Sequence, residues 1–392
     1  RQAVNAINKA IGRKERILVF GDYDVDGCTA VTVVYKFLSE YFSNIDYYIP
    51  DRYDEGYGVS KRCIDYACET GVKLMIVLDC GIKAVKEVEY ARSLGIDVII
   101  CDHHVPDEEL PEAIAILNPK RKDSTYPFAH LSGCGVGFKL MQAFALNNGI
   151  EFNKLLPLLD LCAVSIASDI VPITGENRIL AYHGLRRINS NPSTGLEAII
   201  EICGLSDKEI TMNDIVFKLG PRLNASGRMQ NGKEAVALLV ERKHEKAVEM
   251  ANRINLRSLV IYDPSWHKGV IGIVASRLTE IYYRPAVVLT LSDNLATGSA
   301  RSVAGFDIYK AVESCRDLLE NFGGHTYAAG MSMKPENVPE FKRRFEEYVE
   351  QHISDEQTEA SLDISAVIDF KDITRKFQND LKKFNPFGPG NP

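Results

Sequence analysis

Three short apolar segments, each followed at once by acidic or histidine residues, are the feature that most limits how this chain can fold. Segments of this kind, separated by stretches with helical spacing, are typical of parallel strands buried on both faces of a sheet. The carboxyl ends of parallel strands meet at one edge, where ligands bind. We therefore expect the residues after these segments to lie together. The segments are Arg16–Phe20, Leu74–Leu78 and Asp97–Cys101, and they lead into Asp22–Asp26, Asp79 and Asp102–His104.

The rest of the first half continues this alternation of strands and helices. Further strands are expected at residues 45–49 and 113–117, and helices at 28–40, 61–69, 84–93, 140–145 and 155–167. The predicted fold class is α/β with a mostly parallel sheet. The glycine cluster Gly133–Gly137 is interpreted as a loop entering a helix rather than a nucleotide-binding fingerprint.

A second, smaller α/β unit is expected from residue 258 onward. Its predicted strands are 259–262, 286–291 and 328–333, and its helices are 270–281, 308–320 and 338–352. We divide the chain into a catalytic domain at 1–245, a helix or linker at 246–257, a second domain at 258–353 and a final segment at 354–392. Because the chain starts without Met and ends in an unfinished segment, we expect it to be part of a longer protein.

The composition excludes several classes of protein. The net charge of −7 is unlike that of a protein that coats nucleic acid, so contact with nucleic acid must be local. No run of eighteen apolar residues occurs, so we expect no transmembrane helix, and the first residues lack the apolar region expected of a signal peptide. The nine cysteines form no CxxC pair, and we interpret them as reduced residues of a cytoplasmic protein rather than zinc ligands.

The strand-end residues suggest metal chemistry. Crowded carboxylates resist ionisation unless cations lie between them. Oxygen ligands combined with imidazole suit Mn²⁺ or Mg²⁺, and two such cations can polarise a phosphate and generate hydroxide from water. The pattern therefore predicts a metal-dependent phosphoesterase. The plainer alternative is that each aspartate is a turn or helix-cap residue, and Asp169 alone would read only as a helix terminus.

Several motifs carry a resemblance to a known family. DYDVDG, LDCG, DHH and SIASDIV, in this order, resemble the four motifs of the DHH phosphoesterase superfamily. The later segments GPRLNASGR, WHKGVIGIVASRL, GSARS and FGGH narrow the resemblance to the RecJ family of single-strand-specific 5′→3′ exonucleases. The resemblance implies a DHH domain, a DHHA1 domain and the start of an OB-like β-barrel. Relatives in that family usually have a longer, more charged connection than residues 255–257 provide, which indicates either a shorter linker here or residues missing from the sequence.

The resemblance also implies roles for individual residues. Metal ligands would be Asp22, Asp24, Asp26, Asp79, His103 and Asp169, with Asp79 bridging two cations. Catalytic roles are expected for Asp79, Asp102, His103, His104 and His325. The DNA strand and its terminal phosphate would contact Arg52, Arg222, Asn224, Arg228, Ser299, Arg301, Gly323, Gly324 and His325.

The implied activity is degradation of single-stranded DNA from its 5′ end to mononucleotides, in recombination and repair. A helicase and a single-strand-binding protein are the implied partners. One alternative is another DHH-DHHA1 enzyme that acts on oligoribonucleotides or cyclic dinucleotides. An alternative of another class is a noncatalytic single-strand-binding scaffold of the Cdc45 type, which would be expected to have eroded acidic motifs.

Overall fold

The computed structural model describes residues 1–51, 55–229, 232–254, 257–354, 356–358 and 367–384. The chain divides into two compact units, Arg1–Leu256 and Arg257–Pro392, each with an apolar core of its own. Arg52 and the short connection at residues 255–256, both singled out from the sequence, lie outside the described residues. Among the described helices, none is both long and apolar enough to span a bilayer.

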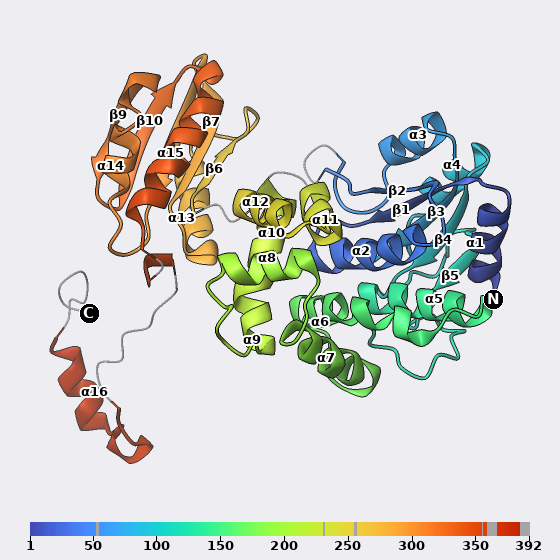
Figure 1. Cartoon of the computed structure of the whole chain (residues 1–392). Helices are drawn as coiled ribbons and strands as arrows, with labels where there is room; N and C mark the ends of the chain where they lie inside the picture. Colours follow the sequence, from blue (N-terminus) through green and yellow to red (C-terminus); the bar gives the residue numbers. More distant parts are fainter. Residues whose placement is uncertain (52–54, 230–231, 255–256, 355, 359–366, 385–392) are drawn as a thin grey trace. The chain divides into compact units, whose positions relative to one another are not determined.

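The first unit is built on a parallel sheet. Its described residues form five strands in the order β2-β1-β3-β4-β5, and every neighbouring pair is parallel (Figure 1). The strands are β1 (Arg16–Gly21), β2 (Ile45–Tyr48), β3 (Val72–Leu78), β4 (Asp97–Cys101) and β5 (Ala115–Leu117). Gly21 pairs with Leu78, and Leu78 pairs with Cys101, so β1, β3 and β4 end side by side. The predicted parallel sheet is confirmed.

Helices cover both faces of this sheet. Side chains alternate between the faces of a strand, and in β1 Ile17 and Val19 bury against one group of helices while Leu18 and Phe20 bury against the other. Figure 1 shows the second group, α3 and α4, on one side of the strands. The first group is α1 (Gln2–Gly12), α2 (Val25–Ser39) and α5 (Gly133–Asn147), and the second is α3 (Lys61–Glu69) and α4 (Val85–Ser93).

A helical layer completes the first unit. Its central helix α6 (Leu159–Ser168) is almost wholly buried and packs against α2 and α7. Burial on all sides explains why the sequence of α6 is apolar throughout. The other helices are η1 (Phe152–Lys154), η2 (Leu156–Leu158), α7 (Gly175–Ile188), α8 (Thr194–Ile202), α9 (Met212–Asp214), the π-helical turn η3 (Ile215–Leu219), α10 (Gly220–Met229), α11 (Gly232–Val240) and α12 (His244–Ile254).

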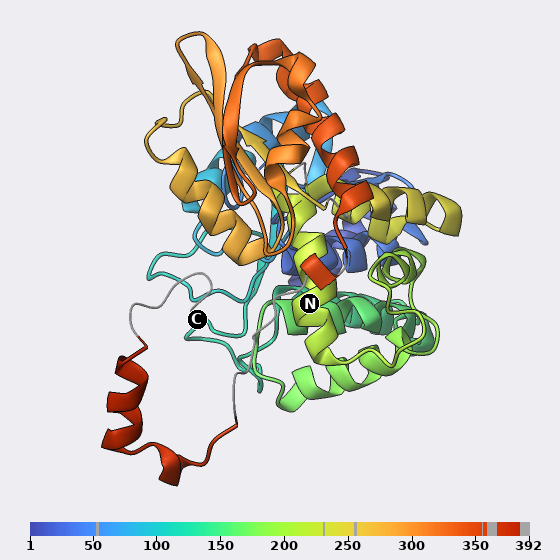
Figure 2. The ribbon, with the colours of Figure 1, turned by 90° about the vertical axis from the view of Figure 1, so that its left-hand side faces the viewer.

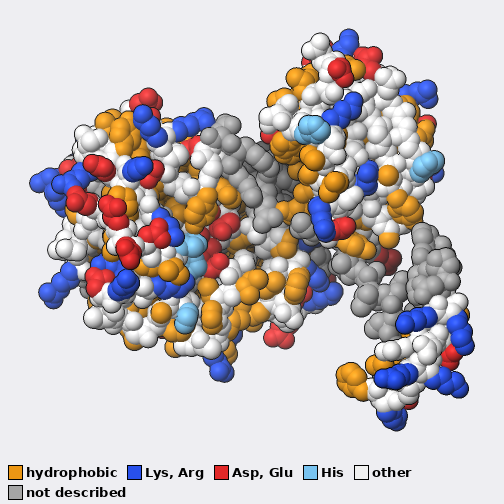
Figure 3. All heavy atoms as spheres, turned by 180° about the vertical axis from the view of Figure 1, so that it is seen from behind, with side chains coloured by type: hydrophobic (Ala, Val, Ile, Leu, Met, Phe, Trp, Pro, Cys, Tyr) orange, Lys and Arg blue, Asp and Glu red, His pale blue; other side chains and the backbone are white. Residues whose placement is uncertain are grey.

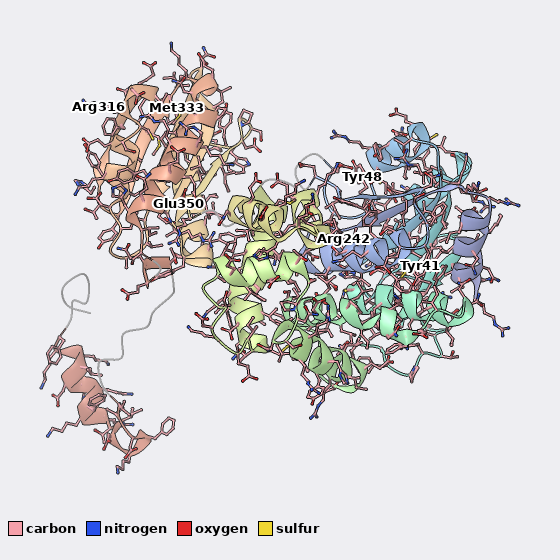
Figure 4. The ribbon with its side chains drawn as sticks, viewed as in Figure 1. Tyr41, Tyr48, Arg242, Arg316, Met333 and Glu350 are labelled. Carbon is pink, nitrogen blue, oxygen red and sulfur yellow. The ribbon has the colours of Figure 1, made fainter. Side chains whose placement is uncertain are left out.

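The second unit is a mixed sheet with helices on both faces. The strand order is β6-β7-β8-β10-β9; β6 and β7 are parallel, and the other neighbours are antiparallel. Helix α13 lies on one face, and α14 and α15 lie on the other (Figure 2). Met333 at the end of β10, labelled in Figure 4, is buried in this core. The elements are β6 (Leu259–Tyr262), α13 (Ile271–Tyr282), β7 (Ala286–Ser292), β8 (Leu295–Arg301), α14 (Ile308–Glu313), η4 (Arg316–Leu318), β9 (Leu319–His325), β10 (Ala328–Met333), η5 (Pro335–Asn337) and α15 (Val338–His352).

Two sequence predictions are wrong in detail. The helix expected over 308–320 ends at Glu313, and residues 319–325, including the FGGH motif, form strand β9. Pairing with β10 supplies the partner that the local pattern could not reveal. The glycine cluster Gly133–Gly137 is not a loop but the start of α5, because Ser132 caps this helix by accepting a hydrogen bond from the N–H of Gly135 (3.1 Å).

The segment after α15 contains η6 (Glu356–Thr358), η7 (Phe370–Asp372) and α16 (Arg375–Lys382). Between residues 354 and 384, the described positions include no strand. The OB-like barrel expected here is therefore not shown.

Candidate metal centre

The acidic motif after β1 is positioned by the start of α2. Asp24 is the N-cap of this helix, and its Oδ1 accepts a hydrogen bond from the N–H of Gly27 (2.9 Å). This cap starts α2 at Val25, three residues before the predicted start, and places Asp26 in its first turn. Asp22, at the end of the strand, is only 1% exposed. Burial, and then the charge of Asp24, raise the pKa of Asp22 to about 7.

Asp26 is held by three hydrogen bonds from two other elements. Its Oδ2 accepts from the N–H of Gly133 (2.6 Å), and its Oδ1 accepts from the N–H of Cys134 (2.7 Å) and from Oγ of Ser165 (2.7 Å). Buried carboxylates need such donors because burial removes their hydration. The orientation of Asp26 is therefore determined by α5 and α6.

Asp79 leaves the sheet directly after β3. Its backbone is left-handed (φ 59°), a conformation that aspartate tolerates better than most residues, and its N–H still donates to the carbonyl of Cys101 (2.9 Å). The side chain is 2% exposed. Burial, followed by the charges of Asp26 and Asp24, raises the pKa of Asp79 well above its ordinary value. Such a carboxylate is unstable as an anion unless a cation approaches it.

His103 lies at the centre of the acidic residues. Its Nε2 is 3.2 Å from Oδ1 of Asp79, 3.6 Å from Oδ2 of Asp169 and 3.7 Å from Oδ2 of Asp26. Burial lowers the pKa of His103, which favours the neutral imidazole that binds metals. Asp169 arrives from the C-terminus of α6, where burial and then Asp26 and Asp24 raise its pKa to about 7.

Asp102 and His104 form a separate pair beside this group. Oδ1 of Asp102 accepts from Nδ1 of His104 (2.8 Å), and its Oδ2 accepts from the N–H of Ile82 (2.9 Å). Burial acts to raise the pKa of Asp102, but hydrogen bonds from His104 and Ile82 outweigh it and lower the pKa. The same contact raises the pKa of His104. Asp102 thus orients His104, whose side chain is 45% exposed.

The donor set fits divalent cations. Within the described part of the chain, Oδ1 of Asp22, Oδ1 of Asp79 and both ring nitrogens of His103 are buried without a hydrogen-bond partner. Unpaired buried polar atoms are costly, and metal coordination would satisfy them. Figure 3 shows acidic and histidine side chains gathered on one face of the first unit. Two groups have ligand atoms within 4.8 Å of one another: Asp79, His103 and His104, and Asp26, His103 and Asp169.

The residues expected to contact the DNA strand are spread over both units. Asn224, on α10, accepts at Oδ1 a hydrogen bond from the N–H of Val25 (3.2 Å), so it supports the start of α2. Nη1 of Arg222 donates to the carbonyl of Lys218 (2.9 Å). Arg228 belongs to α10, but its side chain lies outside what the structure describes.

In the second unit, Ser299 and Arg301 lie on β8, and Nη1 of Arg301 donates to Oγ of Ser299 (2.8 Å). The structure brings these two side chains together. Gly323, Gly324 and His325 lie on β9 and are exposed.

Sequence reasoning missed Tyr57 and Ser165. The hydroxyl of Tyr57 lies 3.3 Å from the carbonyl oxygen of Asp79, and its ring meets His104 edge-on with centroids 6.0 Å apart. Tyr48, labelled in Figure 4, donates its hydroxyl to Glu55 (2.8 Å), two residues before Tyr57. The position of Tyr57 after β2, at the same sheet edge, was the available signal. The signal for Ser165 was its place as the first residue of the SIASDIV motif, although the apolar helix around it does not indicate its partner.

Comparisons with known proteins agree with this arrangement. The family model of the DHH N-terminal domain matches residues 16–166, and that of the DHHA1 domain matches residues 255–351. The single-stranded-DNA-specific exonuclease RecJ of Bacillus subtilis is 37% identical, with 100% of this chain and 53% of the relative aligned. RecJ of Escherichia coli is 33% identical over 99% of this chain and 75% of the relative. The chain thus spans about half of the first relative and three quarters of the second.

Solved structures give the same result. A crystal structure of exonuclease RecJ bound to manganese is similar with a TM-score of 0.61 and 30% identity, covering 90% of this chain and 94% of that one. RecJ from Thermus thermophilus in complex with Mn²⁺ gives a TM-score of 0.58 and 27% identity over 100% of this chain and 60% of that one. The fold, the order of the motifs and these relatives together show that the chain belongs to the RecJ family of the DHH phosphoesterases.

Proposed function

We propose that this chain is a metal-dependent exonuclease that degrades single-stranded DNA from its 5′ end to mononucleotides. The observation that carries the proposal is the group of buried, unpaired Asp and His atoms at the carboxyl edge of the parallel sheet. Two RecJ relatives of similar structure are described as bound to manganese. We infer that two divalent cations, Mn²⁺ or Mg²⁺, occupy this edge here. Their ligands would be Asp22, Asp24, Asp26, Asp79, His103 and Asp169.

Bound cations would supply Lewis acidity toward the phosphate and lower the pKa of an attacking water. The chain's own residues would do the rest. His103, neutral and central, holds its Nε2 toward three carboxylates. His104 keeps Nδ1 on Asp102, and its Nε2, which lies 3.4 Å from the hydroxyl of Tyr57, is the nitrogen that we propose contacts the substrate. Because the pKa of His104 is raised, its protonated form is available to donate to a phosphate oxygen or to the leaving 3′ oxygen.

We propose that the second unit binds the single-stranded DNA. Ser299 and Arg301 offer a hydroxyl and a guanidinium fork that suit a terminal phosphate. Gly323 and Gly324 on β9 are exposed and lack side chains, so single-stranded DNA could come close to their backbone, with His325 beside them. Arg52, Arg222, Asn224 and Arg228 complete the proposed contacts, and His325 keeps its proposed catalytic role.

The cellular setting is inferred from the same chemistry. The nine cysteines of the chain are free thiols, and most are buried, as in proteins of a reducing cytoplasm. An enzyme that digests only single strands needs duplex to be opened, so a helicase and a single-strand-binding protein are the proposed partners in recombination and repair.

Asp79→Asn tests the metal mechanism. Asparagine keeps the shape of the side chain and tolerates the left-handed backbone at this position, but it lacks the charge. We expect hydrolysis of single-stranded DNA to fall to background while the circular dichroism spectrum stays unchanged. Mn²⁺-dependent release of nucleotides at a near-normal rate by this variant would contradict the mechanism.

Substrate class is tested with labelled DNA. We expect 5′-labelled single strands to release labelled mononucleotide in Mn²⁺ or Mg²⁺, duplex to resist, and chelator to stop the reaction. Faster cleavage of dinucleotides or short RNA than of long single-stranded DNA would favour an oligoribonuclease or cyclic-dinucleotide phosphodiesterase. Binding of single strands without any release would favour a Cdc45-like scaffold.

A further inference from the structure

The N-terminus of α5 lies against the candidate metal centre. The N–H groups of Gly133 and Cys134, its first two residues, donate to the two oxygens of Asp26 (2.6 and 2.7 Å). The first N–H groups of a helix have no partner within the helix and carry a partial positive charge. Asp26, a residue of another helix, therefore satisfies this end of α5, and α5 in turn orients Asp26.

A pair of serine hydroxyls extends this arrangement. Oγ of Ser165 donates to Oδ1 of Asp26 (2.7 Å), and the hydroxyls of Ser165 and Ser132 are 2.6 Å apart. Because Ser165 gives its one proton to Asp26, Ser132 must be the donor between the two serines. Ser132 accepts in turn from the N–H of Gly135 (3.1 Å). Hydrogen bonds that point in one direction along a buried chain strengthen one another.

The same helix end also limits the position of Asp79. A Cβ atom at Gly133 would lie 2.6 Å from Cγ of Asp79, closer than non-bonded carbon atoms approach, and still closer to Oδ1. Any side chain at position 133 would therefore displace this carboxylate. One segment thus touches two carboxylates that come from different elements and lie 3.7 and 3.2 Å from Nε2 of His103.

We propose that Ser132, Gly133, Cys134 and Ser165 are positioning residues that pre-arrange Asp26 and Asp79 for cations. Oδ1 of Asp26 already has two donors and Oδ2 has one, and Oδ2 is the oxygen nearer His103. Oδ2 of Asp26, which accepts only one hydrogen bond, is therefore the oxygen that we expect to bind a cation beside His103. This inference rests on the proposed metal-dependent function, and it gives a role to the start of the glycine cluster, which the sequence suggested was only a loop entering a helix.

Gly133→Ala is the first test, with Mn²⁺ affinity measured by isothermal titration calorimetry on the full chain. Alanine in a helix normally stabilises it relative to glycine, so a loss would come from the collision with Asp79. We expect Mn²⁺ affinity to fall about 10- to 100-fold, the range seen when groups that orient metal ligands are changed. Gly137→Ala is the matched control, because its Cβ would meet side-chain methyls of Leu78 and Val34 at 3.2 and 3.3 Å and the carbonyl oxygen of Ala30 at 3.9 Å, but no carboxylate among its three nearest atoms.

Ser165→Ala is the second test, and Ser168→Ala is its control on the same helix. Ser165 donates to Asp26, whereas Oγ of Ser168 is without a hydrogen-bond partner among the described residues. We expect Ser165→Ala to weaken Mn²⁺ binding about 10-fold and to change the electron paramagnetic resonance spectrum of bound Mn²⁺. Ser168→Ala should leave both close to those of the unmodified chain.

Thermal melting in chelator separates positioning from simple stability. Equal melting temperatures in chelator, with a smaller Mn²⁺-induced rise in the variants, would support positioning. Lower melting temperatures with unchanged Mn²⁺ affinity and spectrum would overturn it, since the residues would then be structural only. If the unmodified chain binds Mn²⁺ but digests no DNA, the proposed exonuclease fails while the positioning of the carboxylates stands.

Discussion

At the scale of single residues, the candidate centre is a group of carboxylates held under unfavourable conditions. Asp22, Asp79 and Asp169 are removed from water and lie near like charges, which raises the pKa of each. Three hydrogen-bond donors hold the carboxylate of Asp26 in place. The group is therefore stable when it is protonated or when cations neutralise it, and costly when it is ionised and empty.

The pH dependence of the melting temperature should differ between the metal-free and the metal-bound chain. In chelator, Asp22 and Asp169 have pKa values near 7, raised from 3.8. A raised carboxyl pKa contributes stability below the unfolded value that is lost as pH rises through the folded value. We expect the melting temperature in chelator to fall by several degrees between pH 5 and pH 8, and Mn²⁺ to restore it most at pH 8.

Asp22→Asn is the control for this measurement. Asparagine cannot ionise, so the fall in chelator should be shallower for this variant than for the unmodified chain. A melting temperature in chelator that rises steadily from pH 5 to pH 8 in the unmodified chain would contradict the expected sign.

At the scale of helices and strands, some predicted substrate residues have structural tasks. Asn224 was expected to contact DNA, yet its Oδ1 accepts a hydrogen bond from the N–H of Val25 at the start of α2. The glycines of the FGGH motif were also expected to contact DNA, yet they pair with β10. A residue at the end of a helix or in a pair of β-strands can stabilise the fold, bind the substrate or do both. Matched variants distinguish these roles.

Asn224→Ala should destabilise the first unit. The variant removes the acceptor for the N–H of Val25, which costs about 1 kcal/mol for a typical hydrogen bond. Asn224→Asp retains an acceptor oxygen and should recover most of that loss in urea unfolding. Unchanged stability in Asn224→Ala, with weaker DNA binding, would show that Asn224 acts on the substrate alone.

The two glycines of β9 should respond differently to alanine. A Cβ at Gly324 would lie 2.5 Å from Cα of Ala329, whereas one at Gly323 meets no described atom within 4 Å. We expect Gly324→Ala to destabilise the second unit by about 1–3 kcal/mol, as measured by thermal melting. Gly323→Ala should melt normally and, if DNA passes this face, bind single strands more weakly. Equal melting temperatures for both variants would argue against the β9–β10 pairing described.

At the scale of the whole molecule, the proposed metal ligands and several of the proposed DNA contacts lie in different units. All the proposed metal ligands lie within Arg1–Leu256, whereas Ser299, Arg301 and His325 lie within Arg257–Pro392. Each unit has its own core. Joining two binding surfaces in one chain makes the second contact intramolecular and raises overall affinity.

Expressing residues 1–256 alone should separate the two activities. We expect this fragment to keep Mn²⁺ binding and the slow hydrolysis of a small phosphodiester such as bis(p-nitrophenyl) phosphate. Its affinity for single-stranded DNA should fall by about 100-fold, because the linked second unit is missing. Fluorescence anisotropy with a labelled oligonucleotide measures this, and affinity equal to that of the full chain would refute the division of roles.

The sequence by itself determined the elements that carry the chemistry. Buried parallel strands have continuous apolar stretches, and such stretches placed β1, β3 and β4, with acidic residues directly after each. Helices α3 and α15 and strand β10 also follow their predicted bounds, because helical and strand periodicities are local properties. The convergence of the Asp and His residues followed from the parallel topology.

Only the tertiary structure decided which distant groups meet. Ser165 reaches Asp26 across 139 residues, and Asn224 reaches Val25 across 199. Residues 319–325 became a strand because β10 offered a partner. A local pattern reports burial and period but not the partner of a hydrogen bond, which packing selects from the whole chain. For that reason the sequence named the carboxylates of the centre, and the fold alone assigned the helix end that holds two of them.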